Sequence, residues 1–202
     1  MQSILDKIVA QRRLDVAEAK AAVPEQALRD LIRARAPAND LVATLTLAAP
    51  MAVLAEIKRA SPSKGNIAMG IDAAQQALAY ALAGACTIST LTEPTWFKGS
   101  LGDLDNVRAA LVEAGLSEGS AAPVCVLRKD FLIDEYQLLE ARAYGADTAL
   151  LIVAILPPDE LVRLMAASRA LGMEPLVEVT PMRRCACLLN IPSSPFISLD
   201  HS

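Results

Sequence analysis

The chain has 202 residues, is 53% hydrophobic and only 3% aromatic, and carries a formal net charge of −4. Its length and apolar content are enough for a buried core, whereas the mild negative charge and the few aromatic rings argue against a nucleic-acid or anionic-membrane partner. Charge appears early in the N-terminal residues and no apolar run reaches ~18 residues, so we expect neither a signal peptide nor a membrane span, and the predicted compartment is the cytoplasm.

Two helices and a linker are predicted in the first quarter of the chain. Apolar residues recur at helical spacing over 3–21, with Ser3 as the N-cap. A second helix is predicted over 25–36, because Pro37 disfavours its continuation. Residues 39–50 are predicted to connect these helices to the rest of the chain. Three cations are assigned to the solvated face of the first helix: Arg12, Arg13 and Lys20.

From residue 53 onward strands alternate with helices. Aliphatic runs predict strands over 53–58, 87–91, 124–129, 148–153 and 175–179, with a weaker candidate over 196–199. Helices are predicted over 73–83, 104–114, 135–144 and 159–171, with Asp72 and Asp134 as N-caps. Left-handed C-caps are expected at three glycines: Gly84, Gly145 and Gly172. This alternation predicts a parallel sheet covered by helices.

A (β/α)8 barrel is favoured over a doubly wound sheet. No Gly-x-Gly-x-x-Gly follows the first strand, so a dinucleotide site has no support. Charged residues stand instead at the carboxyl ends of three predicted strands: Glu56 with Lys58, then Lys129, then Glu178. Barrel enzymes carry their catalytic groups at that end.

The barrel is expected to be incomplete. A barrel unit takes about 30 residues, so residues 53–202 have room for about five or six of the eight units. We therefore predict an N-terminal helical extension and linker over 1–52, units 1–5 over 53–179 and a divergent, truncated tail over 180–202. Three prolines crowd this tail: Pro181, Pro192 and Pro195.

The end of the first strand has the composition of an anionic-substrate site. Glu56 and Lys58 are two residues apart, so on a strand they share a face and can pair. Buried charges are costly unless they are paired. The loop 61–65, Ser-Pro-Ser-Lys-Gly, then adds two hydroxyls, a cation and a flexible glycine. These residues predict one wall of a site for a carboxylate or phosphate.

Lys129 and Glu178 could supply a general acid and a general base at the same barrel mouth. The competing interpretation is that each is a strand-end ion pair at the rim of a barrel. For any one residue the two interpretations are about equally good, but the repetition on three strands favours a functional site.

The cysteines do not indicate a metal site. Cys86 and Cys125 lie in apolar runs and are interpreted as small core residues. Cys185 and Cys187 form a C-x-C without a second pair or a His cluster, so no zinc site is predicted. His201, in the tail, is interpreted as incidental.

Several longer motifs resemble one family. They are Ala-Glu-Ile-Lys-Arg-Ala-Ser-Pro-Ser-Lys-Gly at 55–65, Leu-Thr-Glu-Pro-Thr-Trp-Phe-Lys-Gly-Ser at 91–100, Leu-Arg-Lys-Asp-Phe at 127–131 and Gly-Met-Glu-Pro-Leu-Val-Glu-Val at 172–179. In register and order, they resemble indole-3-glycerol-phosphate synthase, a carboxy-lyase of tryptophan biosynthesis. The likeness is greatest to the synthase segment of the fungal multifunctional tryptophan proteins.

The resemblance implies a reaction and a set of roles. The reaction is ring closure of 1-(2-carboxyphenylamino)-1-deoxyribulose 5-phosphate with loss of carbon dioxide and water. The resemblance implies that Lys129 is the general acid, that Glu178 assists later proton transfer, and that Glu56 and Lys58 lie beside the acid lysine and the substrate carboxylate. It also implies that Lys58 binds the substrate together with four further residues: Ser61, Pro62, Phe97 and Phe131. No metal or organic cofactor is implied.

The tail departs from the family pattern and leaves alternatives open. The Asn-Asn-Arg motif of the family's sixth strand is absent, and Leu-Asp-His-Ser stands near its place at 199–202. One alternative is a non-catalytic truncated product or a gene-model error. Another is a different phosphate-binding barrel such as phosphoribosylanthranilate isomerase, against which the Glu-Ile-Lys and Lys-Asp-Phe motifs argue. The implied partners are a phosphorylated small molecule and other tryptophan-pathway domains in a longer polypeptide.

Overall fold

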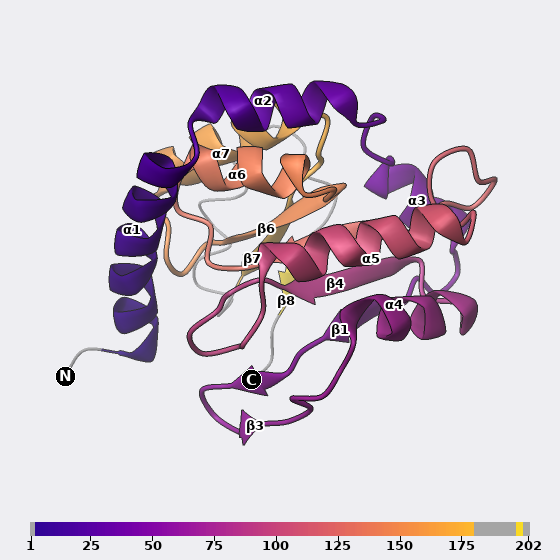
Figure 1. Cartoon of the computed structure of the whole chain (residues 1–202), viewed down its shortest axis with the longest axis horizontal. Coiled ribbons are helices and arrows are strands. Elements are labelled where there is room, and N and C mark those ends of the chain that lie inside the picture. Colours follow the sequence, from indigo (N-terminus) through magenta and orange to yellow (C-terminus); the bar gives the residue numbers. More distant parts are fainter. Residues whose placement is uncertain (1–2, 180–196, 200–202) are drawn as a thin grey trace.

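One parallel sheet organises the chain, whose computed structural model describes residues 3–179 and 197–199 (Figure 1). Within these residues the sheet has six strands: β1 (Leu54–Ile57), β4 (Thr87–Leu91), β5 (Cys125–Lys129), β6 (Thr148–Ile152), β7 (Leu176–Val179) and β8 (Ile197–Leu199). Their order in space is β1-β4-β5-β6-β7-β8, the same as along the chain, and every pair is parallel. A doubly wound sheet reverses direction at a switch point. The unreversed order is that of a (β/α)8 barrel, of which the described residues form a part.

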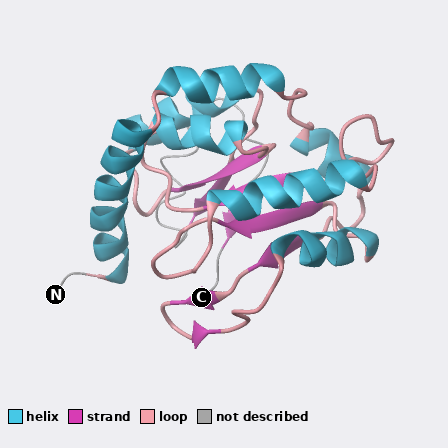
Figure 2. Ribbon diagram, in the orientation of Figure 1, coloured by secondary structure: helices cyan, strands magenta, loops and turns pink. Residues whose placement is uncertain are grey.

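Four helices connect consecutive strands and cover one face of the sheet (Figure 2). They are α4 (Ala73–Leu82), α5 (Leu101–Glu113), α6 (Glu135–Ala143) and α7 (Pro158–Ala170). The predicted caps are confirmed: Asp72 and Asp134 accept hydrogen bonds from the first turns of α4 and α6, and Gly84, Gly145 and Gly172 have φ of 101°, 93° and 79°. A short antiparallel pair, β2 (Ala60–Ser61) with β3 (Gly65–Asn66), lies between β1 and α4.

The start of α5 was predicted wrongly, at residue 104. The helix begins at Leu101 because the Ser100 hydroxyl accepts a hydrogen bond from the Asp103 amide. Serine is a strong N-cap residue.

The two faces of the sheet have different environments. The residues that face the helices form the main core and include Ile57, Ile88, Val126, Leu151 and Val177. The alternate residues Leu127, Leu150 and Ile152 form a second cluster on the opposite face, together with Leu176. In a barrel this second face is the interior.

Three helices precede the sheet: α1 (Ile4–Ala22), α2 (Glu25–Ala34) and α3 (Leu41–Leu47). Ser3 and Asp6 form a capping box at the start of α1, which confirms the predicted N-cap. In Figure 1, α2 lies over α6, where Leu28 packs against Tyr136 and Leu139. None of the helices in the described ranges is long and apolar enough to cross a bilayer.

Residues 39–50 were wrongly predicted to be only connecting chain. They contain α3, whose first turn is capped by the Asp40 side chain accepting from the Ala43 amide. Its β-branched residues Val42, Thr44 and Thr46 lower its helix propensity. The signal that could have found this helix is an aspartate placed directly before an apolar stretch.

Two predictions about individual side chains need correction. Arg12 is not solvated: only 6% of the residue is exposed, and its guanidinium pairs with two carboxylates. Cys125 is fully buried as predicted, but Cys86 is only partly buried.

The weak strand candidate near the C-terminus is confirmed by β8, which pairs with β7. The rest of the predicted tail, with its three prolines, Cys185, Cys187 and His201, lies outside the described residues.

Candidate functional site

A single carboxylate joins the charged residues of two strands. Glu56 on β1 accepts from the Nζ of Lys58 at 2.5 Å and, with its other oxygen, from the Nζ of Lys129 on β5 at 2.6 Å. The predicted pairing of Glu56 with Lys58 is therefore confirmed. The three side chains are half-buried, with 26%, 35% and 36% of Glu56, Lys58 and Lys129 exposed. We call these three residues the charged triad.

The sheet register explains how residues 73 positions apart come to meet. Glu56 lies opposite Ser89 of β4, and Ser89 lies opposite Leu127 of β5. Lys129, two residues beyond Leu127, therefore projects from the same face at the carboxyl end of its strand. This is the barrel-interior face, opposite to the helices.

The charged triad is positive overall. Burial alone would raise the pKa of Glu56, but hydrogen bonds from Lys129 and Lys58, together with their charges, lower it below its usual value. Glu56 is therefore ionised at neutral pH, and two ammonium groups around one carboxylate leave one net positive charge. Because the triad is partly open to solvent, it can attract an anionic group.

Glu178 lies on the same interior face, two strands away from Lys129. It stands on β7 opposite Ile152 of β6 and is partly buried. Ile152 belongs to the interior cluster. Four predicted site residues therefore share one face, and three of them are joined by direct contacts through Glu56.

The loop after β1 begins with a well-anchored arginine. Arg59 donates from both terminal nitrogens to Asp103 at the start of α5, each at 2.7 Å. Burial opposes ionisation of Asp103, but the hydrogen bond and charge of Arg59 lower the pKa of this carboxyl. Beyond it, the Ser61 hydroxyl accepts from the Lys64 amide at 3.2 Å, and Pro62 is exposed. The anchored Arg59 thus restrains the backbone between Lys58 of the charged triad and the loop that carries Ser61 and Pro62.

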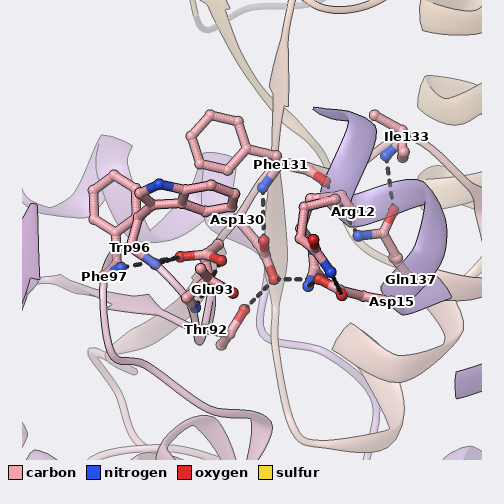
Figure 3. Close-up of polar contacts among 12 residues, drawn as sticks. Arg12, Asp15, Thr92, Glu93, Trp96, Phe97, Asp130, Phe131, Ile133 and Gln137 are labelled. Carbon is pink, nitrogen blue, oxygen red and sulfur yellow. Dashed lines mark hydrogen bonds and ion pairs between the residues drawn. The ribbon is translucent and has the colours of Figure 1, made fainter. Parts of the chain in front are cut away.

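Two aromatic rings meet above the ends of β4 and β5. The ring centroids of Phe97 and Phe131 are 5.9 Å apart and the rings are inclined by 43° (Figure 3). Both side chains are partly exposed. Such a pair offers an apolar surface to an aromatic ligand.

The residue that shapes the loop after β4, which carries Phe97, was not predicted from the sequence. Glu93 is fully buried, and its carboxylate accepts from the backbone amides of Thr95, Trp96 and Phe97 at 2.6–3.0 Å. The available signal was a glutamate directly after a buried strand and before Pro94.

Arg12 and Asp130 were also not predicted as part of this region. They come from distant parts of the chain and meet beside the end of β5 (Figure 3). No sequence pattern links two residues that are 118 positions apart.

No group of three or more His, Cys, Asp or Glu side chains in the described ranges is arranged to hold a metal ion.

Comparisons with known proteins show which family the chain resembles. The sequence pattern of the family described as indole-3-glycerol phosphate synthase matches residues 5–194. A multifunctional tryptophan biosynthesis protein of Phycomyces blakesleeanus is 51% identical over 187 residues, which cover 88% of this chain and 23% of that protein. One from Phanerodontia chrysosporium is 50% identical over 194 residues, covering 94% of this chain and 24% of that protein.

A relative named only as the synthase is also similar. The indole-3-glycerol phosphate synthase of Roseiflexus sp. (strain RS-1) is 42% identical over 179 residues, covering 89% of this chain and 65% of that protein. The chain thus spans about a quarter of the fungal relatives' length and about two thirds of the bacterial one's. The match of the family pattern to most of the chain confirms the resemblance of its motifs: the chain belongs to the indole-3-glycerol phosphate synthase family.

Proposed function

We propose that the chain carries the acid–base part of an indole-3-glycerol phosphate synthase. The substrate would be 1-(2-carboxyphenylamino)-1-deoxyribulose 5-phosphate and the product indole-3-glycerol phosphate, formed with release of carbon dioxide and water. The observation that carries this proposal is the contact of Glu56 with both Lys58 and Lys129 on one sheet face.

Lys129 is the proposed general acid. The aromatic carbon that bears the carboxylate attacks the substrate's carbonyl carbon, and the carbonyl oxygen takes a proton from the ammonium group and becomes a hydroxyl. A positioned acid of this kind contributes about 10²–10⁴-fold to a rate. The 2.6 Å contact with Glu56 supports this role, because a carboxylate next to the ammonium group fixes its place.

Lys58, with Ser61 and Pro62, is proposed to bind the substrate carboxylate. The net positive charge of the triad suits this anion, and the polar loop after β1 supplies hydroxyl and amide donors. Carbon dioxide then leaves from this carboxylate, and its bonding electrons return to the ring.

Phe97 and Phe131 are proposed to hold the substrate's aromatic ring. Their centroid separation of 5.9 Å leaves the two rings inclined to each other and partly open to solvent, so a third ring can pack against them. Orienting this ring toward the carbonyl brings the reacting carbons together.

In the dehydration, the new hydroxyl takes a proton from a lysine ammonium group of the charged triad and leaves as water. Glu178 is proposed to accept the proton that the neighbouring CH₂ of the new ring loses as the double bond forms. Its support is its position at the end of β7 on the face that also carries the charged triad. A second carboxylate, separate from the one that holds the lysines, allows the two proton transfers to use different groups.

We also propose that the chain acts within a longer polypeptide that carries other tryptophan-pathway domains. The support is that the fungal relatives are multifunctional tryptophan biosynthesis proteins and that this chain matches about a quarter of each. The compartment we propose is the cytoplasm, in keeping with Cys86 and Cys125 being free thiols.

The test is to incubate the purified chain with the substrate and follow the fluorescence of the indole product. Lys129→Ala should lower the rate by about 10²-fold or more, whereas Lys7→Ala, an exposed lysine on α1, should not change it. Equal rates for the chain and for Lys129→Ala, or no product from either, would show that the proposal is wrong.

A further inference from the structure

A buried aspartate, Asp130, lies in the chain between the proposed acid Lys129 and the aromatic residue Phe131. Asp130 separates Lys129 from Phe131, and only 2% of it is exposed. Its carboxylate accepts hydrogen bonds from four donors: the Phe131 amide at 2.8 Å, the Thr92 hydroxyl at 2.7 Å, Arg128 Nη2 at 3.1 Å and Arg12 Nη2 at 3.3 Å. The Asp130 side chain therefore fixes the backbone on which the Lys129 and Phe131 side chains stand.

Three of the four donors lie on or directly after β4 and β5, but Arg12 comes from α1. Figure 3 shows Arg12 pointing at Asp130 from the side opposite to Thr92. Its other terminal nitrogen donates to Asp15, one turn further along α1, at 2.8 Å. Arg12 thus links the N-terminal extension to the segment of the proposed acid, 118 residues away in sequence.

The burial of Arg12 indicates that this link is specific. Enclosing a guanidinium group is costly, and the cost is offset only where carboxylates accept from it. Its planar fork allows Arg12 to engage two carboxylates at once, which a lysine with a single nitrogen would do less well. Arg13, the next residue on α1, is exposed.

We propose that Arg12 is a positioning residue for the reaction, which acts through Asp130 on the segment Lys129–Phe131. The inference deepens the proposed function and rests on it for the meaning of Lys129 and Phe131. The helix α1 then helps to set where the side chains of Lys129 and Phe131 stand. Misplacement of a reacting group by about 1 Å can cost on the order of 10²-fold in rate.

The test is Arg12→Met, which keeps the apolar stem and removes the charge. We expect kcat to fall on the order of 10-fold or more while KM changes less. We also expect the Phe131 amide, which donates to Asp130, to exchange its hydrogen faster, while amides of β6 keep their rates. Arg13→Ala is the matched control and should change none of these quantities.

Exchange at Phe131 separates a failure of this inference from a failure of the proposed function. If the unaltered chain has no activity, the proposed function is wrong. The amide exchange rate of Phe131 alone then tests whether Arg12 restrains the segment Lys129–Phe131. A folded Arg12→Met variant with unchanged Phe131 exchange and unchanged kcat would overturn the inference. Should Arg12→Met fail to fold, Asp15→Ala takes its place: it removes the second acceptor of Arg12, so a smaller change in the same direction is expected, and no change would contradict the proposal.

Discussion

Replacing Glu56 by glutamine tests whether the charged triad is held by charge. The substitution keeps the shape of the side chain but removes the carboxylate that accepts from Lys58 at 2.5 Å and Lys129 at 2.6 Å. Hydrogen bonds to charged groups contribute about 1.5–3 kcal/mol each. Because about a third of each side chain is exposed, solvent screens them. We therefore expect a loss in the free energy of unfolding of about 1–3 kcal/mol at neutral pH, and not the full sum.

The pH dependence makes this prediction specific. The pKa of Glu56 is lowered in the folded chain below its usual 4.5, so the unfolded chain binds this proton more readily. The stabilisation is complete above that usual value and is lost as the pH falls through the lower, folded-state pKa. Glu56→Gln has no such titration, so the stability difference between the two chains should be largest at neutral pH and shrink as the pH falls below the usual carboxyl value of 4.5.

Urea unfolding followed by circular dichroism at several pH values measures this difference. Glu113→Gln, at the exposed end of α5, is the matched control and should change stability by less than about 0.5 kcal/mol at any pH. An equal loss for Glu56→Gln at neutral and acid pH would refute the reasoning, because packing and not charge would then carry the effect.

Three further predictions concern the aromatic pair, one glycine and one cysteine. Phe131→Ala should raise KM by about 3- to 10-fold, because the substrate's ring would lose its contact with Phe131 and an aromatic contact contributes about 0.5–1.5 kcal/mol; an unchanged KM in steady-state kinetics would contradict this. Gly99→Ala should lower the melting temperature, because a Cβ there would lie 2.0 Å from the Leu91 carbonyl oxygen; calorimetry should find the unaltered chain more stable. Burial raises the pKa of Cys125 to about 12, so peptide mapping after alkylation of the native chain at about pH 8 should find this thiol unmodified.

The sequence predicted the strands well because each buried strand is a short, continuous run rich in apolar or β-branched residues. All five residues of β4 and of β6 are buried, and each strand follows a glycine that ends the preceding helix. The pairing of Glu56 with Lys58 was equally predictable, since residues two apart on a strand share a face. The contact with Lys129 needed the order of the strands, because β4 separates β1 from β5.

What the sequence did not predict depends on contacts between distant residues or between a side chain and nearby backbone. Arg12 stands at helical spacing between Ile8 and Val16, on the buried face of α1, but its charge favoured the solvated face, and its carboxylate partner Asp130 is 118 residues away. The turn held by Glu93 has no periodicity to detect. The helix α3 is short, has β-branched residues at three of its seven positions, and is signalled only by the aspartate that caps it.

The residues that hold the candidate site follow a common arrangement. At the end of β1, Lys58 is followed by Arg59, which is fixed to α5; at the end of β5, Lys129 is followed by Asp130, which is fixed by four donors. On a strand, neighbouring side chains point to opposite faces, so the residue after a site lysine points away from the site. An anchor at that position restrains the backbone of the lysine without occupying the space that the substrate needs. Lys58 and Lys129 can therefore remain partly open to solvent and still be held in place, as general acid chemistry requires.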